Sequence, residues 1–385
     1  MSVPPGRRTA PSLSLLILLL LLLLLHHASA KPLSISPRRA QNSDGTYLTG
    51  PVMQQNFPDP SIIYADGEWW AFATMDMDIN IQVARSPDFE DWTYLQGVDA
   101  LPHPPGWVNM TNPNTWAPDV NQLDDGSFVL YFSATTTEDA TKHCIGAATS
   151  DAVVGPYTPV KGTMACPLDK GGAIDSSGFK DWDIRGSGWG PGSGYSNETG
   201  EDNVYSNARW SCGGAGGQRY IVYKVDGNAI GNGGICGNTI EPIVPTPLML
   251  QAVADDGITP LGDPVTLLDN AGVSDDGLVE APALVKTWDG DYVLFFSSGC
   301  FSTQNYTISY AVSTSGLVTG PYERADGPLL KTGDLGGALT SPGGMDVHWD
   351  AKRMVFHAQD VSKAPDLVRE MWAASIEIRD GSMVI

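Results

Sequence analysis

The chain has 385 residues and a formal net charge of −22. This charge argues against nucleic acid or an anionic membrane as a partner, because like charges repel one another. With 43 glycines, 28 prolines and only 17% charged residues, the composition favours short strands joined by turns over amphipathic helices. We therefore expect a β-rich protein whose charge favours a neutral substrate or simply gives solubility in an acidic medium.

The first thirty residues have the pattern of a secretory signal peptide. Arg7 and Arg8 are followed by an apolar run at residues 13–25 and by the small-residue cleavage site Ala28-Ser29-Ala30. The apolar run is shorter than the roughly 18 residues that a membrane-spanning helix needs. We expect residues 1–30 to be removed and the mature protein to be secreted without a membrane anchor.

Five units of similar pattern follow along the chain. Each combines an acidic residue, a short apolar strand, a turn and a second strand. The units begin at Asp59, Asp119, Asp175, Glu280 and Asp346. Their spacing is about 55 to 75 residues once an insertion at about residues 186–217 of the third unit is set aside. Four short strands in each of five units predict a β-propeller.

The predicted fold is therefore all-β, a five-bladed β-propeller with four-stranded antiparallel blades over residues 51–385. Residues 31–50 show no periodicity and are expected to form a loose N-terminal arm. The insertion at about residues 186–217 is predicted to be a loop of blade three that could wall off one side of a pocket. A β-sandwich would have a similar strand content, but it would not explain five units of like length.

Prolines stand beside three of the acids and stiffen the backbone there. The three motifs are Pro58-Asp59-Pro60, Ala117-Pro118-Asp119 and Glu280-Ala281-Pro282. A single acid beside a proline is often only a turn residue. The innermost strands of propeller blades line a central channel, however, so acids that recur at one register should meet in a single shallow pocket. Carboxylates gathered in this way indicate acid–base chemistry on a glycosidic bond.

Combined in this order, the motifs resemble those of glycoside hydrolase family 43, whose five-bladed propellers act on arabinose- and xylose-containing polysaccharides. The resemblance runs from about Pro51 to the end of the chain. It rests on Phe57-Pro58-Asp59-Pro60-Ser61, Trp116-Ala117-Pro118-Asp119-Val120, Ile174-Asp175 with Phe179, and Val279-Glu280-Ala281-Pro282.

The resemblance implies an inverting mechanism carried by three acids. Asp59 matches the general base and Glu280 matches the general acid. Asp119 matches the third acid, which orients Glu280 and favours its protonated form by charge repulsion. An inverting pair stands roughly 6.5–9.5 Å apart to admit a water molecule, a gap that suits acids on blades one and four.

Candidate substrate contacts lie beside the motif acids: Phe57, Trp116, Asp175 and Phe179. For Phe57 and Phe179, packing inside a blade is an equally good interpretation. Trp107 and Asn114 precede the second blade and are candidates for contacting the next sugar.

No cofactor or metal is required. Many members of the family carry Gly-His in the fifth blade, where the histidine helps to hold a central ion, but this chain has Gly343-Gly344 there. We predict structural roles for the nearby His348 and His357. A structural calcium held in the central channel by carboxylates and waters stays compatible with the sequence.

A secreted protein can form disulfides, although spacing does not fix their pairing. Of the five cysteines we favour Cys144–Cys166 and Cys236–Cys300, because Cys212 lies in the glycine-rich insertion. Three glycosylation sequons begin at Asn109, Asn197 and Asn305.

We expect a secreted, monomeric, inverting hydrolase of arabinofuranosyl or xylosyl linkages in plant cell-wall polysaccharide. An α-L-arabinofuranosidase is preferred, with β-xylosidase and endo-1,5-α-L-arabinanase as alternatives. From another class, a non-catalytic carbohydrate-binding propeller is the rival, although it would not need all three acids. A retaining, fructan-acting relative would show Glu-Cys-Pro and Asn-Asp-Pro-Asn motifs, and neither occurs.

Overall fold

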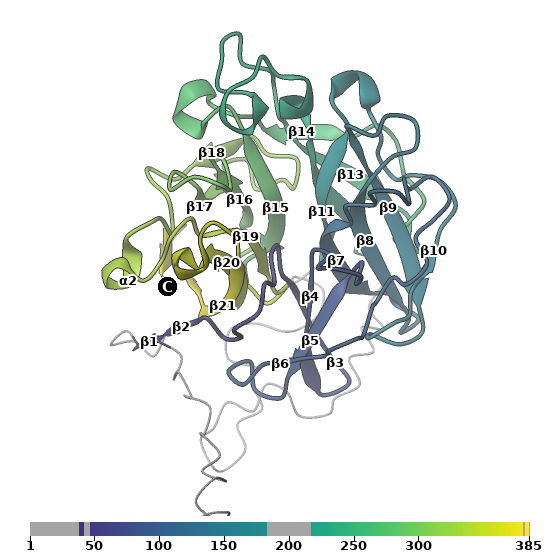
Figure 1. The fold of residues 1–385 in the computed structure, drawn as a ribbon, viewed down its shortest axis with the longest axis horizontal. Coiled ribbons are helices and arrows are strands. Elements are labelled where there is room, and N and C mark those ends of the chain that lie inside the picture. Colours follow the sequence, from purple (N-terminus) through teal and green to yellow (C-terminus); the bar gives the residue numbers. More distant parts are fainter. Residues whose placement is uncertain (1–37, 42–46, 183–216, 380–381, 385) are drawn as a thin grey trace, which may run out of the picture. The chain divides into compact units, whose positions relative to one another are not determined.

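The computed structural model describes residues 38–41, 47–182, 217–379 and 382–384. Their strands form five antiparallel blades, four of which have four strands and one of which has five. Figure 1 shows the blades arranged around a common axis. The predicted all-β, five-bladed propeller is confirmed. Within the described residues no helix is long and apolar enough to cross a membrane. The predicted signal peptide, the sequon at Asn197, Cys212 and nearly all of the insertion lie outside these residues.

The blades follow one another in chain order. Blade one contains β3 (Ser61–Ala65), β4 (Glu68–Ala73), β5 (Gln82–Ser86) and β6 (Thr93–Tyr94). Blade two contains β7 (Trp116–Gln122), β8 (Phe128–Thr135), β9 (His143–Ser150) and β10 (Thr158–Pro159). Blade three contains β11 (Ala173–Lys180), β12 (Arg219–Val225), β13 (Leu248–Val253) and β14 (Val265–Leu268). Blade four contains β15 (Val279–Lys286), β16 (Tyr292–Ser298), β17 (Thr307–Ser313) and β18 (Tyr322–Arg324).

Blade five is closed by the N-terminal segment. Its order is β19 (Gly343–Val347), β20 (Arg353–Gln359), β21 (Arg369–Ser375) and then β2 (Tyr47–Gly50), with β1 (Arg38–Gln41) outside β2. The expectation of a loose arm over residues 31–50 therefore needs correction, because β2 supplies the fourth strand of this blade and β1 pairs with it. A side chain at Gly50 would overlap the indole ring of Trp372, which explains the glycine at the end of β2. A two-stranded hairpin, β22 (Glu377–Arg379) and β23 (Ser382–Val384), follows.

The blades are buried on both faces. Every residue of β8 and of β16 is buried, so these strands are continuous apolar runs without alternation. The aromatic residues of these two strands are buried, Phe132 and Phe295 completely. Stacked blades thus bury the apolar faces that a single blade would leave exposed.

The insertion joins blade three at the end of β11 that lies away from the acids. Ala173 at the start of β11 pairs with Val225, whereas Lys180 at its far end pairs with Arg219. The chain between Lys180 and Arg219 thus leaves and re-enters the blade at the end opposite Asp175. The insertion itself lies outside the described residues, so the wall expected beside the pocket stays a prediction.

Two disulfides join Cys144 to Cys166 and Cys236 to Cys300, as predicted. Replacing Cys236 and Cys300 by serine should lower the free energy of unfolding by about 4 kcal/mol, because this bond constrains the unfolded chain over a separation of 64 residues. The same change at Cys144 and Cys166, separated by 22 residues, should cost about 3 kcal/mol. Urea denaturation measures both values. Wild-type stability in either double variant would contradict the prediction.

Candidate active site

The innermost strands share one irregular position near their starts. In β7, β11, β15 and β19 the pairing register shifts there. In each blade one residue at this place has a positive φ: Asp59 (53°), Ala117 (43°), Asp175 (57°), Ala281 (47°) and Gly344 (55°). These five residues define equivalent points of the five blades.

This alignment corrects the expectation that the acids occupy one register. Asp59 and Asp175 occupy the positive-φ position itself, and Glu280 lies one residue before it. Asp119 and Asp346 lie two residues after it, roughly 7 Å further along their strands. The carboxylates therefore form two layers along the axis, and the predicted trio is divided between them.

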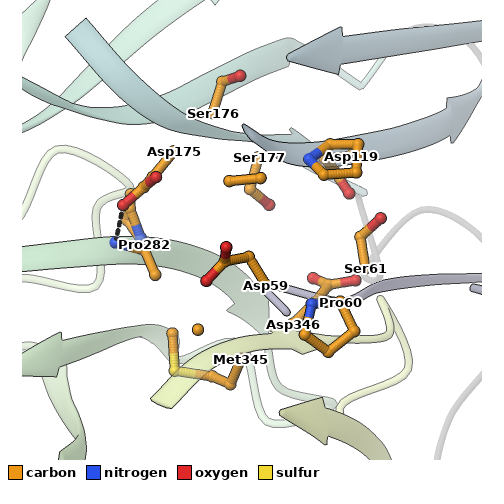
Figure 2. Close-up of a pocket in the computed structure, with 14 residues that line it drawn as sticks. Asp59, Pro60, Ser61, Asp119, Asp175, Ser176, Ser177, Pro282, Met345 and Asp346 are labelled. Carbon is orange, nitrogen blue, oxygen red and sulfur yellow. Dashed lines mark hydrogen bonds between the residues drawn. The ribbon is translucent and has the colours of Figure 1, made fainter. Parts of the chain in front are cut away.

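Both layers line a cavity of about 30 Å³ on the axis, which holds about two water molecules. Figure 2 shows Asp59 and Asp175 on one side of this space and Asp119 on the other. Residues from all five blades contribute: Asp59, Pro60, Ser61, Ala117, Pro118, Asp119, Asp175, Ser176, Ser177, Ala281, Pro282, Gly344, Met345 and Asp346.

Each positive-φ residue presents a backbone N–H that needs an acceptor. In four cases the acceptor is a side chain at or near the end of the second strand of the preceding blade. These side chains belong to Thr74, Ser133, Ser297 and His357. In blade three the equivalent residue, opposite Ile174, is Lys224. An ammonium group cannot accept a hydrogen bond. The N–H of Ala281 therefore donates to Asp175 Oδ2 at 2.9 Å, which fixes Asp175 beside the Glu280 strand.

Asp59 is surrounded by donors. Thr74 Oγ1 donates to Asp59 Oδ2 at 2.7 Å, and Arg369 Nη1 lies 2.9 Å from Oδ1. Burial alone would raise the pKa of Asp59, but the charge of Arg369 and these hydrogen bonds outweigh it, and the net pKa is lowered. Asp59 is therefore ionised at neutral pH, as a general base must be.

Glu280 is nearly buried and accepts two hydrogen bonds. Lys224 Nζ lies 3.0 Å from Glu280 Oε2, and the Tyr306 hydroxyl donates to Oε1 at 2.9 Å. Lys224 also pairs with Asp226, at 3.2 Å. Neither Lys224 nor Tyr306 was predicted as a site residue. Lys224 is recognisable in hindsight, since it is the one charged residue within the apolar run 220–225.

The pKa of Asp175 depends on the charge of Glu280. Burial and then the Glu280 charge raise the pKa of Asp175 to about 8. Asp59 contributes in the same direction. The structure thus brings together Asp59, Asp175 and Glu280 from blades one, three and four.

Asp119 belongs to the deeper layer. Asn121 Nδ2 and the Gly178 N–H donate to its Oδ2, at 2.7 and 2.6 Å, and burial raises the pKa of Asp119 to about 6. Its charge in turn contributes, after burial, to a pKa of about 8 for Asp346. Among the described residues Asp119 forms hydrogen bonds with Asn121 and Gly178, whereas Glu280 forms them with Lys224 and Tyr306. The carboxyl whose pKa is raised by the Glu280 charge is that of Asp175.

The aromatic candidates divide between packing and the site. Phe57 is completely buried in blade one and packs edge-to-face against Tyr94. Phe179 packs between Tyr220 and Tyr292 towards the far end of β11. Both positions match the packing interpretation.

Three other predicted residues are partly exposed. Trp116 is partly exposed and stacks on His143, with ring centroids 3.9 Å apart. Trp107 is partly exposed and lies parallel to Phe132. Asn114 is also partly exposed. These residues stay candidates for sugar contacts.

The two histidines differ in their surroundings. His348 pairs with Asp350 at 3.0 Å and packs against Trp69, as a structural histidine does. His357, also predicted to be structural, accepts the N–H of Asp59 and so lies at the site.

The described residues contain no group of three or more histidine, cysteine or acidic side chains that suits a metal ion. At the axis, both oxygens of Asp346 already accept backbone N–H groups, from Ile62 and Val347 at 2.8 Å each. This donor set does not fit a directly coordinated calcium ion.

The family model described as "Glycosyl hydrolases family 43" matches residues 48–209 of this chain. An extracellular endo-alpha-(1->5)-L-arabinanase of Thermotoga petrophila is 32% identical over 132 residues, which are 29% of this chain and 26% of that protein. An extracellular endo-alpha-(1->5)-L-arabinanase 2 of Bacillus subtilis is 27% identical over 127 residues, 30% of this chain and 25% of that protein. The matches span about a quarter of the length of these relatives.

Solved structures show the same fold. A thermostable family-43 glycoside hydrolase has a TM-score of 0.63 at 20% identity and covers 85% of this chain and 92% of its own. The resemblance to family 43 that the motifs predicted is confirmed.

Proposed function

We propose that this chain, which resembles the glycosyl hydrolases of family 43 in sequence and in fold, is a glycoside hydrolase that cleaves α-L-arabinofuranosyl linkages in arabinose-containing polysaccharides. Both sequence relatives are named endo-arabinanases, and this favours endo action on α-1,5-linked arabinan. The exo-acting α-L-arabinofuranosidase preferred from the motifs is the second candidate. The relatives are also named extracellular, which supports secretion.

One observation carries the proposal. Asp59, Asp175 and Glu280 come from three different blades and interact at one end of the central channel. Among them Asp59 is held ionised, while Asp175 keeps its proton at neutral pH because the pKa is about 8. A base and a protonated carboxyl in one site are what glycosidic hydrolysis needs.

In the proposed reaction Asp59 takes a proton from a water molecule as that water attacks the anomeric carbon. The bond from this carbon to the leaving oxygen breaks as the bond to the water oxygen forms, and Glu280 gives its proton to the leaving oxygen. Asp175, which burial and the Glu280 charge keep protonated, then passes its proton to Glu280. Asp59 releases the proton it took to solvent, Asp175 takes up a proton from solvent, and the cycle closes. We assign the third acidic role to Asp175 in place of Asp119.

Arg369 provides a pH test of the base. Burial favours a high pKa for Asp59, and the guanidinium of Arg369 is the main opposing effect. In Arg369→Met the pKa of Asp59 should rise, and the acidic limb of the kcat/KM profile should move to higher pH, because the base must be ionised. Arg369→Lys keeps the charge and should stay near the wild type. An acidic limb unmoved by Arg369→Met would contradict Asp59 as the base.

Product analysis tests the function itself. Purified protein is incubated with debranched arabinan, arabinoxylan and xylo-oligosaccharides. Short arabino-oligosaccharides from arabinan would establish endo action, and arabinose alone would establish exo action. Xylose from the xylo-oligosaccharides would point instead to β-xylosidase. Binding of arabinan without release of any sugar would favour a carbohydrate-binding propeller and refute the hydrolase.

A further inference from the structure

Two adjacent glycines in blade five leave room for two rings beside the acids. A side chain at Gly343 would overlap the ring of Tyr306. A Cβ atom at Gly344 would lie 2.5 Å from His357 Cε1 and 2.7 Å from Asp59 Oδ1. The tyrosine and histidine rings stack in this space, with centroids 5.9 Å apart and planes 14° apart.

Tyr306 ends a chain of hydrogen bonds that reaches Glu280. The N–H of Gly344 donates to Ser297 Oγ at 2.9 Å, and Ser297 is hydrogen-bonded to Tyr306. The Tyr306 hydroxyl then donates to Glu280 Oε1 at 2.9 Å. Burial, and then the charge of Glu280, hold the pKa of Tyr306 well above its usual value, so the hydroxyl keeps its proton as a donor.

His357 holds the backbone of Asp59. Its Nδ1 accepts the Asp59 N–H at 3.1 Å, so the ring proton lies on Nε2. Burial, followed by the Arg369 charge, lowers the pKa of His357 to about 3, and the ring is neutral. A neutral imidazole is the form that can accept this hydrogen bond.

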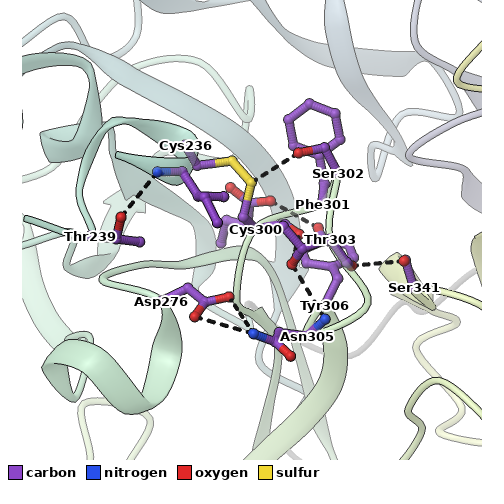
Figure 3. The surroundings of a disulfide bond; sticks show 12 residues. Cys236, Thr239, Asp276, Cys300, Phe301, Ser302, Thr303, Asn305, Tyr306 and Ser341 are labelled. Atoms are coloured by element: carbon purple, nitrogen blue, oxygen red, sulfur yellow. Dashed lines mark hydrogen bonds between the residues drawn. A yellow bond between two sulfur atoms is a disulfide. The ribbon is translucent and has the colours of Figure 1, made fainter. Parts of the chain in front are cut away.

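The loop that carries Tyr306 is fixed at several points, as Figure 3 shows. The disulfide from Cys300 to Cys236 anchors its start. Ser341 Oγ donates to the Thr303 carbonyl at 2.7 Å, and the Tyr306 N–H donates to the same carbonyl at 3.2 Å. A side chain supported in this way can hold a partner group to a fixed geometry.

We propose that Tyr306 and His357 are positioning residues: stacked over Gly343 and Gly344, they hold the general acid Glu280 and the general base Asp59 in one fixed arrangement. The inference rests on the proposed function and adds the residues that set its geometry. Tyr306 acts on the acid and His357 acts on the base.

The leaving group separates the two roles. The dinitrophenolate of a 2,4-dinitrophenyl arabinofuranoside leaves without being protonated, whereas cleavage of arabinotriose needs the general acid. Tyr306→Phe keeps the stacked ring and loses only the hydroxyl. It should lower kcat on arabinotriose roughly ten- to a hundred-fold with little change in KM, and alter kcat on the aryl substrate less than about threefold.

His357→Leu should lower kcat on both substrates by the same factor, because water must be activated whatever the leaving group is. His357→Asn, whose side-chain oxygen can replace Nδ1 as acceptor, should recover most of the loss. An equal loss on both substrates in Tyr306→Phe, or no recovery in His357→Asn, would overturn the inference.

The positioning roles can be tested even if the protein does not hydrolyse arabinosides. If the wild type cleaves neither substrate, hydrolysis of arabinosides is refuted and the positioning roles are read from crystal structures of the variants. The Glu280 carboxyl should leave its present position in Tyr306→Phe, and the Asp59 backbone should shift in His357→Leu. Unmoved carboxyl and backbone positions would overturn the inference without any activity measurement.

Discussion

Replacing Glu280 by glutamine is expected to lower the rate of arabinan hydrolysis by about 10³- to 10⁴-fold, within the range that general acids contribute. Glutamine has nearly the same shape and can still accept from Tyr306, but it has no proton to give the leaving oxygen. Lys224 keeps Asp226 as its partner, so the buried charge is not left alone. Initial rates on arabinan measure the effect.

The control for this variant is the same protein with an activated substrate. On the 2,4-dinitrophenyl arabinofuranoside the loss should be far smaller, because that leaving group needs no acid. Thermal unfolding should show an intact fold. A variant that keeps more than about a tenth of the wild-type rate on arabinan would remove Glu280 from the acid role.

The second large effect separates Asp175 from Asp119. Asp175→Asn should lower kcat by about 10²-fold or more, because asparagine can still accept the Ala281 N–H but cannot store the proton that Glu280 needs. The pKa of Asp175 is about 8 in the wild type, so Asp175 holds a proton up to that pH. In Asp175→Asn the basic limb of the kcat profile should therefore move to lower pH. The measurement is kcat as a function of pH for Asp175→Asn and for the corresponding substitution at Asp119.

Asp119→Asn is the matched comparison, since it is the same substitution in the deeper layer. It disturbs hydrogen bonds from Asn121 and Gly178 and should cost about 1–3 kcal/mol of stability. Its loss of kcat should stay below about tenfold. If Asp119→Asn were the more damaging variant for kcat, the third acidic role would return to Asp119.

The fold was predictable because each blade repeats the same alternation of strands and turns. The register of the acids was not, because it depends on where each innermost strand departs from its partner. At Asp175 and Ala281 that departure is a register shift with positive φ, set by pairing with β12 and β16. Sequence motifs record the acid and the proline without this offset. Asp119 was consequently grouped with Glu280.

The residues that hold the acids were hidden for a related reason. They lie on second and third strands or on a loop, with no motif that ties them to the acids. Lys224 is 56 residues from Glu280 along the chain, and Arg369 is 310 residues from Asp59. Only the radial arrangement brings such pairs together. The same pairing of distant segments explains why β2, whose sequence shows no periodicity, completes blade five beside β21.

The anomeric form of the first product tests the account most directly. Proton NMR during the first turnovers on an α-linked arabinofuranoside follows which anomer appears before mutarotation. With Asp59 activating water opposite the leaving group, the account predicts that the β anomer forms first. Initial formation of the α anomer would require a covalent or same-face route, and it would contradict the assignment of Asp59 as base and Glu280 as acid.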